Sequence, residues 1–163
     1  AKAAGAPVDV DISKLESGQL VRVLWRKKPI WIFKRDEKAL KELNSLEVVN
    51  NLADPNGTGN SKNQQPSYVT KKFRAIENKE SVAVIVGVCT HLGCSPTYRP
   101  EPGAADLGGS SWKGGFYCPC HGSKFDLAGR VYAGVPAPTN LVIPPYKYMT
   151  DTLIRIGIDP EIV

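Results

Sequence analysis

CTHLGCSP at residues 89–96 and CPCHGSKF at residues 118–125 decide how this chain of 163 residues is organised. Together the two stretches contain all 4 cysteines and both histidines of the protein. Side chains that merely fill a hydrophobic core would be scattered along the chain, whereas the ligands of one site must gather at one place. The two stretches therefore predict two loops that close on a common site.

The residue types within each stretch indicate a metal site with mixed ligands. The first offers Cys89 and His91, and the second offers Cys118 and His121. Such a set suits a tetrahedral zinc site, and it also suits a 2Fe-2S centre in which cysteines bind one iron and histidines bind the other. Zinc sites more often space their ligands Cys-x2-Cys and His-x3-His, which favours the iron-sulfur interpretation.

Cys94 and Cys120 remain once these ligands are assigned. Each is close in sequence to a ligand of its own loop, so two loops that hold one cluster would bring the two cysteines together. A disulfide between them would close a segment of about 25 residues and stabilise the fold by roughly 3 kcal/mol. It would also imply an oxidising compartment. Two free thiols are the alternative, and a plain zinc site would explain neither extra cysteine.

The segments around the two loops predict short strands. Residues 18–35 contain two β-branched and aromatic runs separated by a basic turn with Pro29, which indicates strand, turn, strand. The apolar run SVAVIVGVC, residues 81–89, is typical of a buried strand that leads into the first loop. Leucines spaced three apart predict one short helix within residues 36–46. Further strands are predicted in FDLAG, GRVYAG, TNLVIPPYKYM and TLIRIGI, which follow the second loop.

Composition excludes several classes of protein. No window reaches the roughly 18 consecutive apolar residues of a membrane-spanning helix. The formal net charge is +5, but the basic residues are dispersed, and the short runs at residues 26–28 and 71–74 lack interleaved aromatic residues. We therefore expect no nucleic acid as a partner, whereas a basic surface would favour encounter with an acidic protein. The polar residues 50–67 predict an exposed loop without a catalytic role.

The pair CTHLGC and CPCHGS resembles the signature of the Rieske iron-sulfur proteins, specifically the high-potential subunits of cytochrome bc complexes. The similarity continues through residues 129–158 and looks like the proteobacterial branch with its membrane anchor removed. It implies an all-β, Rieske-type fold of stacked antiparallel sheets with a small cluster-binding lobe and one short helix. The head domain would span residues 11–163, with the lobe at about 88–138 inserted between base-fold strands, after a hinge or linker remnant at residues 1–10.

The resemblance also implies the role of each residue in the two loops. Cys94 and Cys120 would form the disulfide, Ser123 would donate a hydrogen bond to a cluster sulfide, and Leu92 would cover the exposed edge. The proline loop GVPAP, residues 134–138, would shield the cluster from a third side. Without the resemblance, Ser123 is a hydroxyl that caps its own loop, and GVPAP is a stiff turn. The implied cofactor contacts in the proline loop are Gly134, Pro136 and Pro138.

The implied metal ligands divide between the two irons of the cluster. Cys89 and Cys118 would bind the inner iron, and His91 and His121 would bind the outer, solvent-facing iron.

Phe125 departs from the pattern of the family. Many high-potential members have a tyrosine at this position, two residues after the serine, and its hydroxyl donates a hydrogen bond to a ligand sulfur. Hydrogen bonds to cluster or ligand sulfurs favour the reduced, more negative state. Phe125 therefore predicts a redox potential somewhat below the top of the Rieske range.

The function implied by the resemblance is electron transfer within a quinol–cytochrome c reductase. The chain would accept an electron from quinol at one 2Fe-2S cluster, coupled to protonation of His91 and His121, and pass it to a c-type cytochrome. The implied partners are cytochrome b and cytochrome c subunits, quinol at a shared site, and the membrane through an N-terminal anchor. The implied location is the bacterial inner membrane, with the head domain facing the periplasm and residues 1–7 (AKAAGAP) serving as a flexible tether.

Two other classes of protein contain similar ligands. A Rieske ferredoxin or oxygenase domain would share the four ligands but typically lacks the additional cysteine pair and the proline loop. A zinc-stabilised interaction module would have no redox role. Cys94, Cys120 and GVPAP favour the reductase subunit over both.

Overall fold

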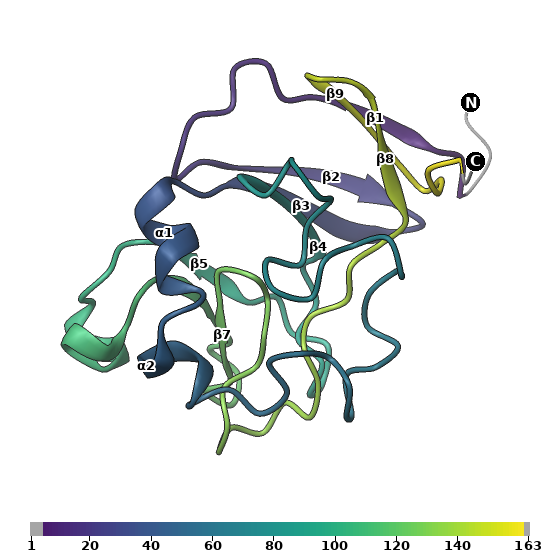
Figure 1. Ribbon diagram of the computed structural model, residues 1–163. Coiled ribbons are helices and arrows are strands. Elements are labelled where there is room, and N and C mark those ends of the chain that lie inside the picture. Colours follow the sequence, from purple (N-terminus) through teal and green to yellow (C-terminus); the bar gives the residue numbers. More distant parts are fainter. Residues whose placement is uncertain (1–4, 162–163) are drawn as a thin grey trace.

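The computed structural model describes residues 5–161, which form three antiparallel sheets of three strands each, stacked one above another in Figure 1. The predicted all-β class is confirmed. The central sheet has the order β2 (Leu20–Trp25), β3 (Lys28–Lys34), β4 (Val82–Val86). The sheet above it has the order β1 (Val8–Asp11), β9 (Leu153–Ile156), β8 (Tyr146–Thr150), and the sheet below has the order β5 (Thr97–Arg99), β6 (Gly115–Tyr117), β7 (Lys124–Asp126).

The central sheet contains the most deeply buried part of the core. All five residues of β4 are buried, which confirms the buried strand predicted from the apolar run. In the neighbouring β3, Trp31 stacks on Phe116 of β6 with ring centroids 5.6 Å apart, and Phe33 meets the same ring edge-on at 5.2 Å. Aromatic pairs of this kind add to the free energy gained by burial. They hold the lower sheet, which carries the second loop, against the central sheet, whose strand β4 leads into the first loop.

The predicted strand–turn–strand at residues 18–35 is present, with its turn in the predicted basic run, but Pro29 lies outside that turn. Arg26 and Lys27 form the turn, with φ of +52° and +63°, as a two-residue hairpin turn with two left-handed positions requires. Pro29 pairs with Leu24 inside the ladder. Proline is tolerated there because it lies at the beginning of β3, where a missing N–H costs little.

Two short helices replace the single helix predicted within residues 36–46. Asp36 caps the first by accepting a hydrogen bond from the N–H of Ala39, and Ser45 caps the second by accepting one from Val48. Because Ser45 has extended backbone angles, the first helix cannot continue through it. The helices are α1 (Glu37–Glu42) and α2 (Leu46–Val49), and two 3-10 turns, η1 (Ala105–Leu107) and η2 (Gly109–Ser111), lie between the two ligand loops.

The segment GRVYAG does not form the predicted strand. Val131 and Tyr132 make only isolated bridges, to Phe125 and Leu52. The polar residues 50–67 consist mostly of turns, as expected, but they are not exposed throughout, since Ser61 is buried.

The predicted linker at residues 1–10 lies partly outside the described residues, which begin at residue 5. Val8 to Val10, the end of that segment, belong to β1 and pair with β9. No helix within residues 5–161 is both long enough and apolar enough to cross a lipid bilayer.

Candidate metal centre

The first ligand loop follows β4 and is closed by its own backbone. The N–H of Cys89 donates to the carbonyl of Cys94 at 2.8 Å, and the N–H of Gly93 donates back to the carbonyl of Cys89 at 3.0 Å. Gly93 has φ of +81°, a conformation that glycine adopts without steric cost. The loop therefore holds Cys89 buried at its base, while Leu92 at its tip is 67% exposed.

The second ligand loop, between β6 and β7, repeats this geometry. The N–H of Cys118 donates to the carbonyl of Ser123 at 2.8 Å, and the N–H of Gly122 donates to the carbonyl of Cys118 at 2.9 Å. Gly122 has φ of +82°, so both loops turn at a glycine in the same conformation. The two loops therefore have the same shape, and each holds its first cysteine at its base.

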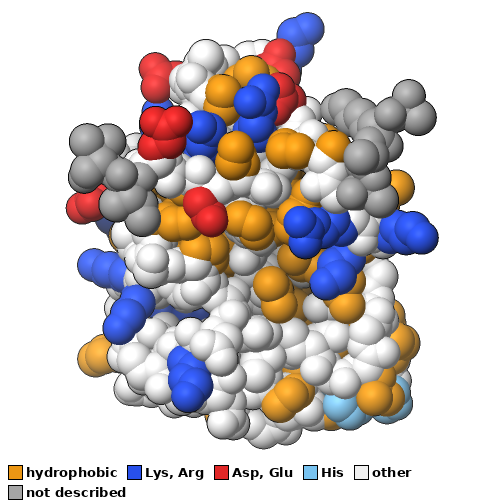
Figure 2. Space-filling model, turned by 90° about the vertical axis from the view of Figure 1, so that its right-hand side faces the viewer, with side chains coloured by type: hydrophobic (Ala, Val, Ile, Leu, Met, Phe, Trp, Pro, Cys, Tyr) orange, Lys and Arg blue, Asp and Glu red, His pale blue; other side chains and the backbone are white. Residues whose placement is uncertain are grey.

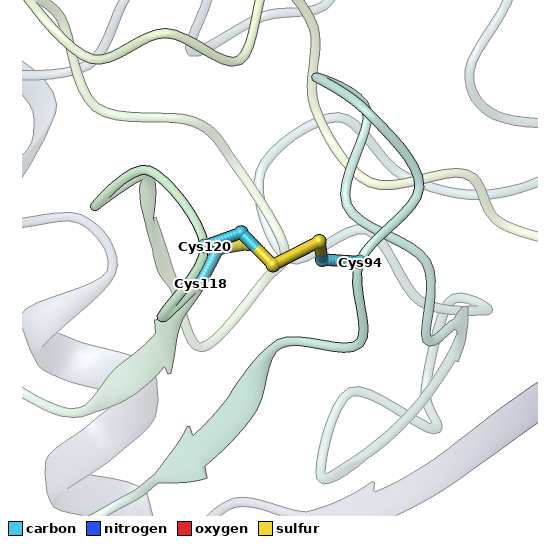
Figure 3. A group of neighbouring side chains, drawn as sticks. All are labelled: Cys94, Cys118 and Cys120. Atoms are coloured by element: carbon cyan, nitrogen blue, oxygen red, sulfur yellow. A yellow bond between two sulfur atoms is a disulfide. The ribbon is translucent and has the colours of Figure 1, made fainter.

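A disulfide joins the two loops. Cys94 and Cys120 are bonded, with their Cα atoms 6.5 Å apart, as Figure 3 shows. This confirms the predicted pairing. The sulfur of Cys118 lies within 4.8 Å of both sulfurs of the bond, but sulfurs consumed in a disulfide do not act as thiolate ligands. Cys118 is therefore the metal-binding candidate of this group.

Cys89 and Cys118 have free thiols, and each is only 2% exposed. Burial raises the pKa of the Cys89 thiol and the neighbouring Cys118 raises it further, whereas the backbone N–H of His91 and the hydroxyl of Ser123 lower it. Buried thiols with a raised pKa are poor nucleophiles by themselves, but a bound metal ion deprotonates a coordinating thiol outright. Together, the buried thiols of Cys89 and Cys118 can form one half of a soft metal site.

The two histidines supply the other half. Their ring centroids are 4.8 Å apart and the rings meet edge-on. The Nδ1 atom of His91 is buried and has no hydrogen-bond partner within the described part of the chain. An unsatisfied buried nitrogen costs about 1–3 kcal/mol, and coordination to a metal would satisfy it.

This donor set fits a 2Fe-2S cluster bound by two thiolates and two imidazoles. The structure places Cys89 beside Cys118 and His91 beside His121, on the two loops that the disulfide joins. Figure 2 shows the histidine side chains at a lower corner of one face, beside hydrophobic side chains. His121 is exposed and His91 is half-buried, so this half of the site faces solvent while the thiols face the core.

Ser123 connects the second loop to the proline loop. Its side chain is fully buried, and its Oγ accepts a hydrogen bond of 2.9 Å from the backbone N–H of Ala137. The hydroxyl hydrogen then remains available to donate, and the Ser123 hydroxyl lowers the pKa of the neighbouring Cys89 thiol. The role of Ser123 toward a cluster sulfide stays a prediction, as do the shielding roles of Gly134, Pro136 and Pro138.

Phe125 lies in β7 opposite Phe116 and is fully buried. Its side chain has no hydroxyl, so the hydrogen bond that a tyrosine would supply at this position is missing. The predicted effect on the redox potential is untested by the structure.

The sequence did not predict two residues whose hydrogen bonds connect the ligand loops to the segment at residues 137–139. Thr90, between the first two ligands, donates a hydrogen bond of 2.7 Å from its Oγ1 to the carbonyl of Thr139. Its place inside the motif was the only available signal. Ala137 contributes through its backbone N–H, for which the side chain gives no signal at all.

Comparisons with known proteins agree with this arrangement. The family described as the Rieske [2Fe-2S] domain matches residues 57–147. The ubiquinol-cytochrome c reductase iron-sulfur subunit of Allochromatium vinosum is 57% identical over 159 residues, which cover 98% of this chain and 73% of that protein. The subunit of the same name from Bradyrhizobium diazoefficiens is 40% identical over 155 residues, which cover 95% of this chain and 74% of that protein. Among solved structures, a chain of a hyperthermophilic respiratory complex III is similar with a TM-score of 0.50 and 25% identity, covering 93% of this chain and 74% of that one.

Proposed function

The chain belongs to the Rieske [2Fe-2S] domain family, and we propose that it is the electron-transfer subunit of a quinol–cytochrome c reductase. The observation that carries this proposal is a pair of disulfide-linked loops that hold two buried free thiols and a buried Nδ1 of His91 for which residues 5–161 offer no hydrogen-bond partner. The names of the similar bacterial subunits indicate the reaction. A Rieske ferredoxin or oxygenase domain is disfavoured because it typically lacks the Cys94–Cys120 pair.

Cys89 and Cys118 would bind the inner iron, and His91 and His121 would bind the outer iron. A 2Fe-2S cluster held in this way takes up and releases one electron, at a higher potential than a cluster with four cysteine ligands. The two thiols lie in the core and the imidazoles lie at the surface. The histidine side of the site is therefore the side that a reductant or an oxidant reaches.

The histidine ligands would also accept the proton that the quinol releases. An imidazole that binds a metal through one nitrogen keeps the second nitrogen for proton exchange. Because Nδ1 of His91 is the buried atom, Nε2 is the nitrogen left to accept a hydrogen bond from a quinol hydroxyl. The exposed Leu92 beside it offers an apolar contact of the kind that ring-shaped ligands require.

Cytochrome b and cytochrome c subunits are the proposed partners, with quinol bound at a site shared with the cytochrome b subunit. The disulfide supports an oxidising compartment, hence a head domain in the periplasm at the bacterial inner membrane. Electron delivery to a separate cytochrome would require the head domain to move on a tether, for which we propose the segment before β1. Attachment to the membrane through an N-terminal anchor stays a prediction.

Iron and sulfide analysis, combined with EPR spectroscopy, tests the proposal. We expect about two irons and two acid-labile sulfides for each chain, and an EPR signal after one-electron reduction with hyperfine coupling to histidine nitrogen. Cys118→Ser should lose the iron, whereas the control Leu24→Ala, at a position of β2 that is 70% exposed and outside both ligand loops, should retain it. A colourless protein that contains one zinc ion instead would contradict the proposal.

A further inference from the structure

The polar loop at residues 54–64 is connected to the metal centre by a continuous series of hydrogen bonds. We infer that this loop positions the first ligand loop, acting through residues 139–140 and Thr90, and thereby influences the redox potential of the site. The inference rests on the proposed function, because it assumes that a redox cluster binds there.

Asp54 gives the loop a fixed shape although the loop contains no helix or strand. Its carboxylate accepts hydrogen bonds from the backbone N–H groups of Thr58, Gly59 and Ser61, at 3.1, 3.0 and 2.9 Å. Aspartate side chains commonly order turns by accepting such bonds. As a result, Ser61 is held at a defined position and is only 1% exposed.

Ser61 and Asp54 together hold Asn140. The Oγ of Ser61 accepts a hydrogen bond of 2.8 Å from the backbone N–H of Asn140, and the Asn140 side chain donates one of 3.2 Å to the carbonyl of Asp54. The side-chain oxygen of Asn140 accepts another, of 2.9 Å, from the N–H of Val131. Asn140 is 1% exposed, so water cannot replace these partners, and the loop fixes the segment directly after the proline loop.

Gln64 provides a second attachment between the same two segments. Its side-chain amide donates to the Oγ1 of Thr139 at 3.0 Å and to the carbonyl of Asn140 at 2.9 Å. The buried Arg74 reinforces this contact, since one nitrogen of its guanidinium group donates to the carbonyls of Gln64 and Leu141. Residues 139–140 are thus bound from two points on the polar loop.

Thr90 connects residues 139–140 to the metal ligands of the first loop. Its hydroxyl donates to the carbonyl of Thr139 at 2.7 Å, and it lies between Cys89 and His91 in the sequence. A surface cavity of about 300 Å³ is bordered by Thr90, Thr139 and Gln64. Because this side of Thr90 is open, the hydrogen bond to Thr139, more than close packing, keeps its side chain in place.

The potential of an iron-sulfur site depends on the hydrogen bonds to its sulfurs and on its exposure to solvent. A displacement of residues 139–140 would move Thr90 and the two ligands that flank it. It would also loosen the proline loop at residues 134–138, which precedes the displaced segment. Both effects would reach the cluster from a loop that supplies no ligand.

Ser61→Ala tests the inference by removing one buried oxygen from the loop. The control is Ser45→Ala, which removes a serine oxygen that likewise accepts a backbone hydrogen bond, from Val48, at the start of α2. Iron-loaded proteins are compared by redox titration and by the line width of the EPR spectrum after reduction. We expect a shifted midpoint potential and broader lines for Ser61→Ala, and wild-type values for Ser45→Ala.

Thr90→Val shows whether the effect passes through Thr90. It should also shift the potential, and because both substitutions interrupt one series of bonds, the double variant with Ser61→Ala should shift it by less than the sum. Thr90→Ser, which keeps the hydroxyl, should restore the wild-type potential. Additive shifts would overturn the inference.

Two further outcomes distinguish a failure of the proposed function from a failure of the inference. A wild-type protein without a 2Fe-2S signal contradicts the proposed function, whereas a wild-type cluster with an unchanged potential in Ser61→Ala overturns only the inference. If Ser61→Ala does not fold, Gln64→Met removes the second attachment and answers the same question by the same two measurements.

Discussion

Hydrogen bonds to the ligand sulfurs are one determinant of the potential of an iron-sulfur site, and the side chain of Phe125 cannot donate one. We predict that Phe125→Tyr raises the midpoint potential, because a hydroxyl that donates to a sulfur stabilises the reduced, more negative state. Redox titration of the iron-loaded variant is the measurement. Phe125→Leu, which introduces no donor, should keep a potential near that of the wild type. An unchanged or lowered potential in Phe125→Tyr would count against the assignment.

Ser123 has two partners, so its loss has two measurable effects. Ser123→Ala leaves the buried N–H of Ala137 without the acceptor that it has at 2.9 Å, which should lower the free energy of unfolding by about 1–3 kcal/mol. The variant also loses a donor toward the sulfur side of the site, so its midpoint potential should fall. Denaturant unfolding of the metal-free protein and redox titration of the loaded protein measure the two effects separately. Wild-type stability would show that the bond to the proline loop contributes nothing.

At the scale of elements, the disulfide is the covalent connection between the two ligand loops. Cys94 and Cys120 are 26 residues apart, and replacing both by alanine should lower the free energy of unfolding by roughly 3 kcal/mol in the chain-entropy description. We expect the double variant to bind iron, since all four ligands remain, but to lose it at a lower temperature. A thermal transition at the wild-type temperature would contradict this prediction.

The segment between the two ligand loops is held by Arg99. Its guanidinium group forms ion pairs with Glu101 and Asp106, and the hydrogen bond from Arg99 lowers the pKa of the Asp106 carboxyl below its ordinary value of 3.8. Because the carboxyl has a lower pKa in the folded state, the pair stabilises the fold above the unfolded pKa, and this is lost as pH falls through the folded pKa. The contribution is small at this exposed site.

NMR titration of the Asp106 side chain checks this prediction. The carboxyl should titrate at a lower pH in the wild type than in Arg99→Met, in which the donor is absent. Equal midpoints in the two proteins would show that the ion pair does not persist in solution.

At the scale of the whole molecule, the features that the sequence predicts correctly are those that depend on a local pattern of residue types. The apolar run before Cys89 identified the buried strand β4, and the gathering of Cys and His residues identified the metal centre. The assignment of the four ligands left Cys94 and Cys120 as a pair, the resemblance implied the same disulfide, and the structure confirms it. These features depend on residue types within short windows, so a single sequence is sufficient to find them.

Other features were not predicted, either because they depend on the local choice of a cap or turn or because their partners are distant in the chain. Ser45 divides a helix whose leucine spacing looked continuous, because its side chain favours a new cap over the next helical turn. Ser61 and Asn140 are far apart in the chain, and only the folded backbone shows that they are bonded. The basic run predicts the hairpin turn, but not that Arg26 and Lys27 form it in the left-handed conformation while Pro29 pairs with Leu24 within the strand ladder.

The midpoint potential of the iron-loaded protein as a function of pH tests the central claim most directly, because it reports the cluster and its histidine ligands together. Metal-bound imidazoles become more acidic when the cluster is oxidised, so electron uptake is coupled to proton uptake once they begin to deprotonate. The account predicts a potential that is constant at low pH and falls as the pH rises beyond the titration of His91 and His121. A potential that stays constant from neutral to strongly alkaline pH would contradict it.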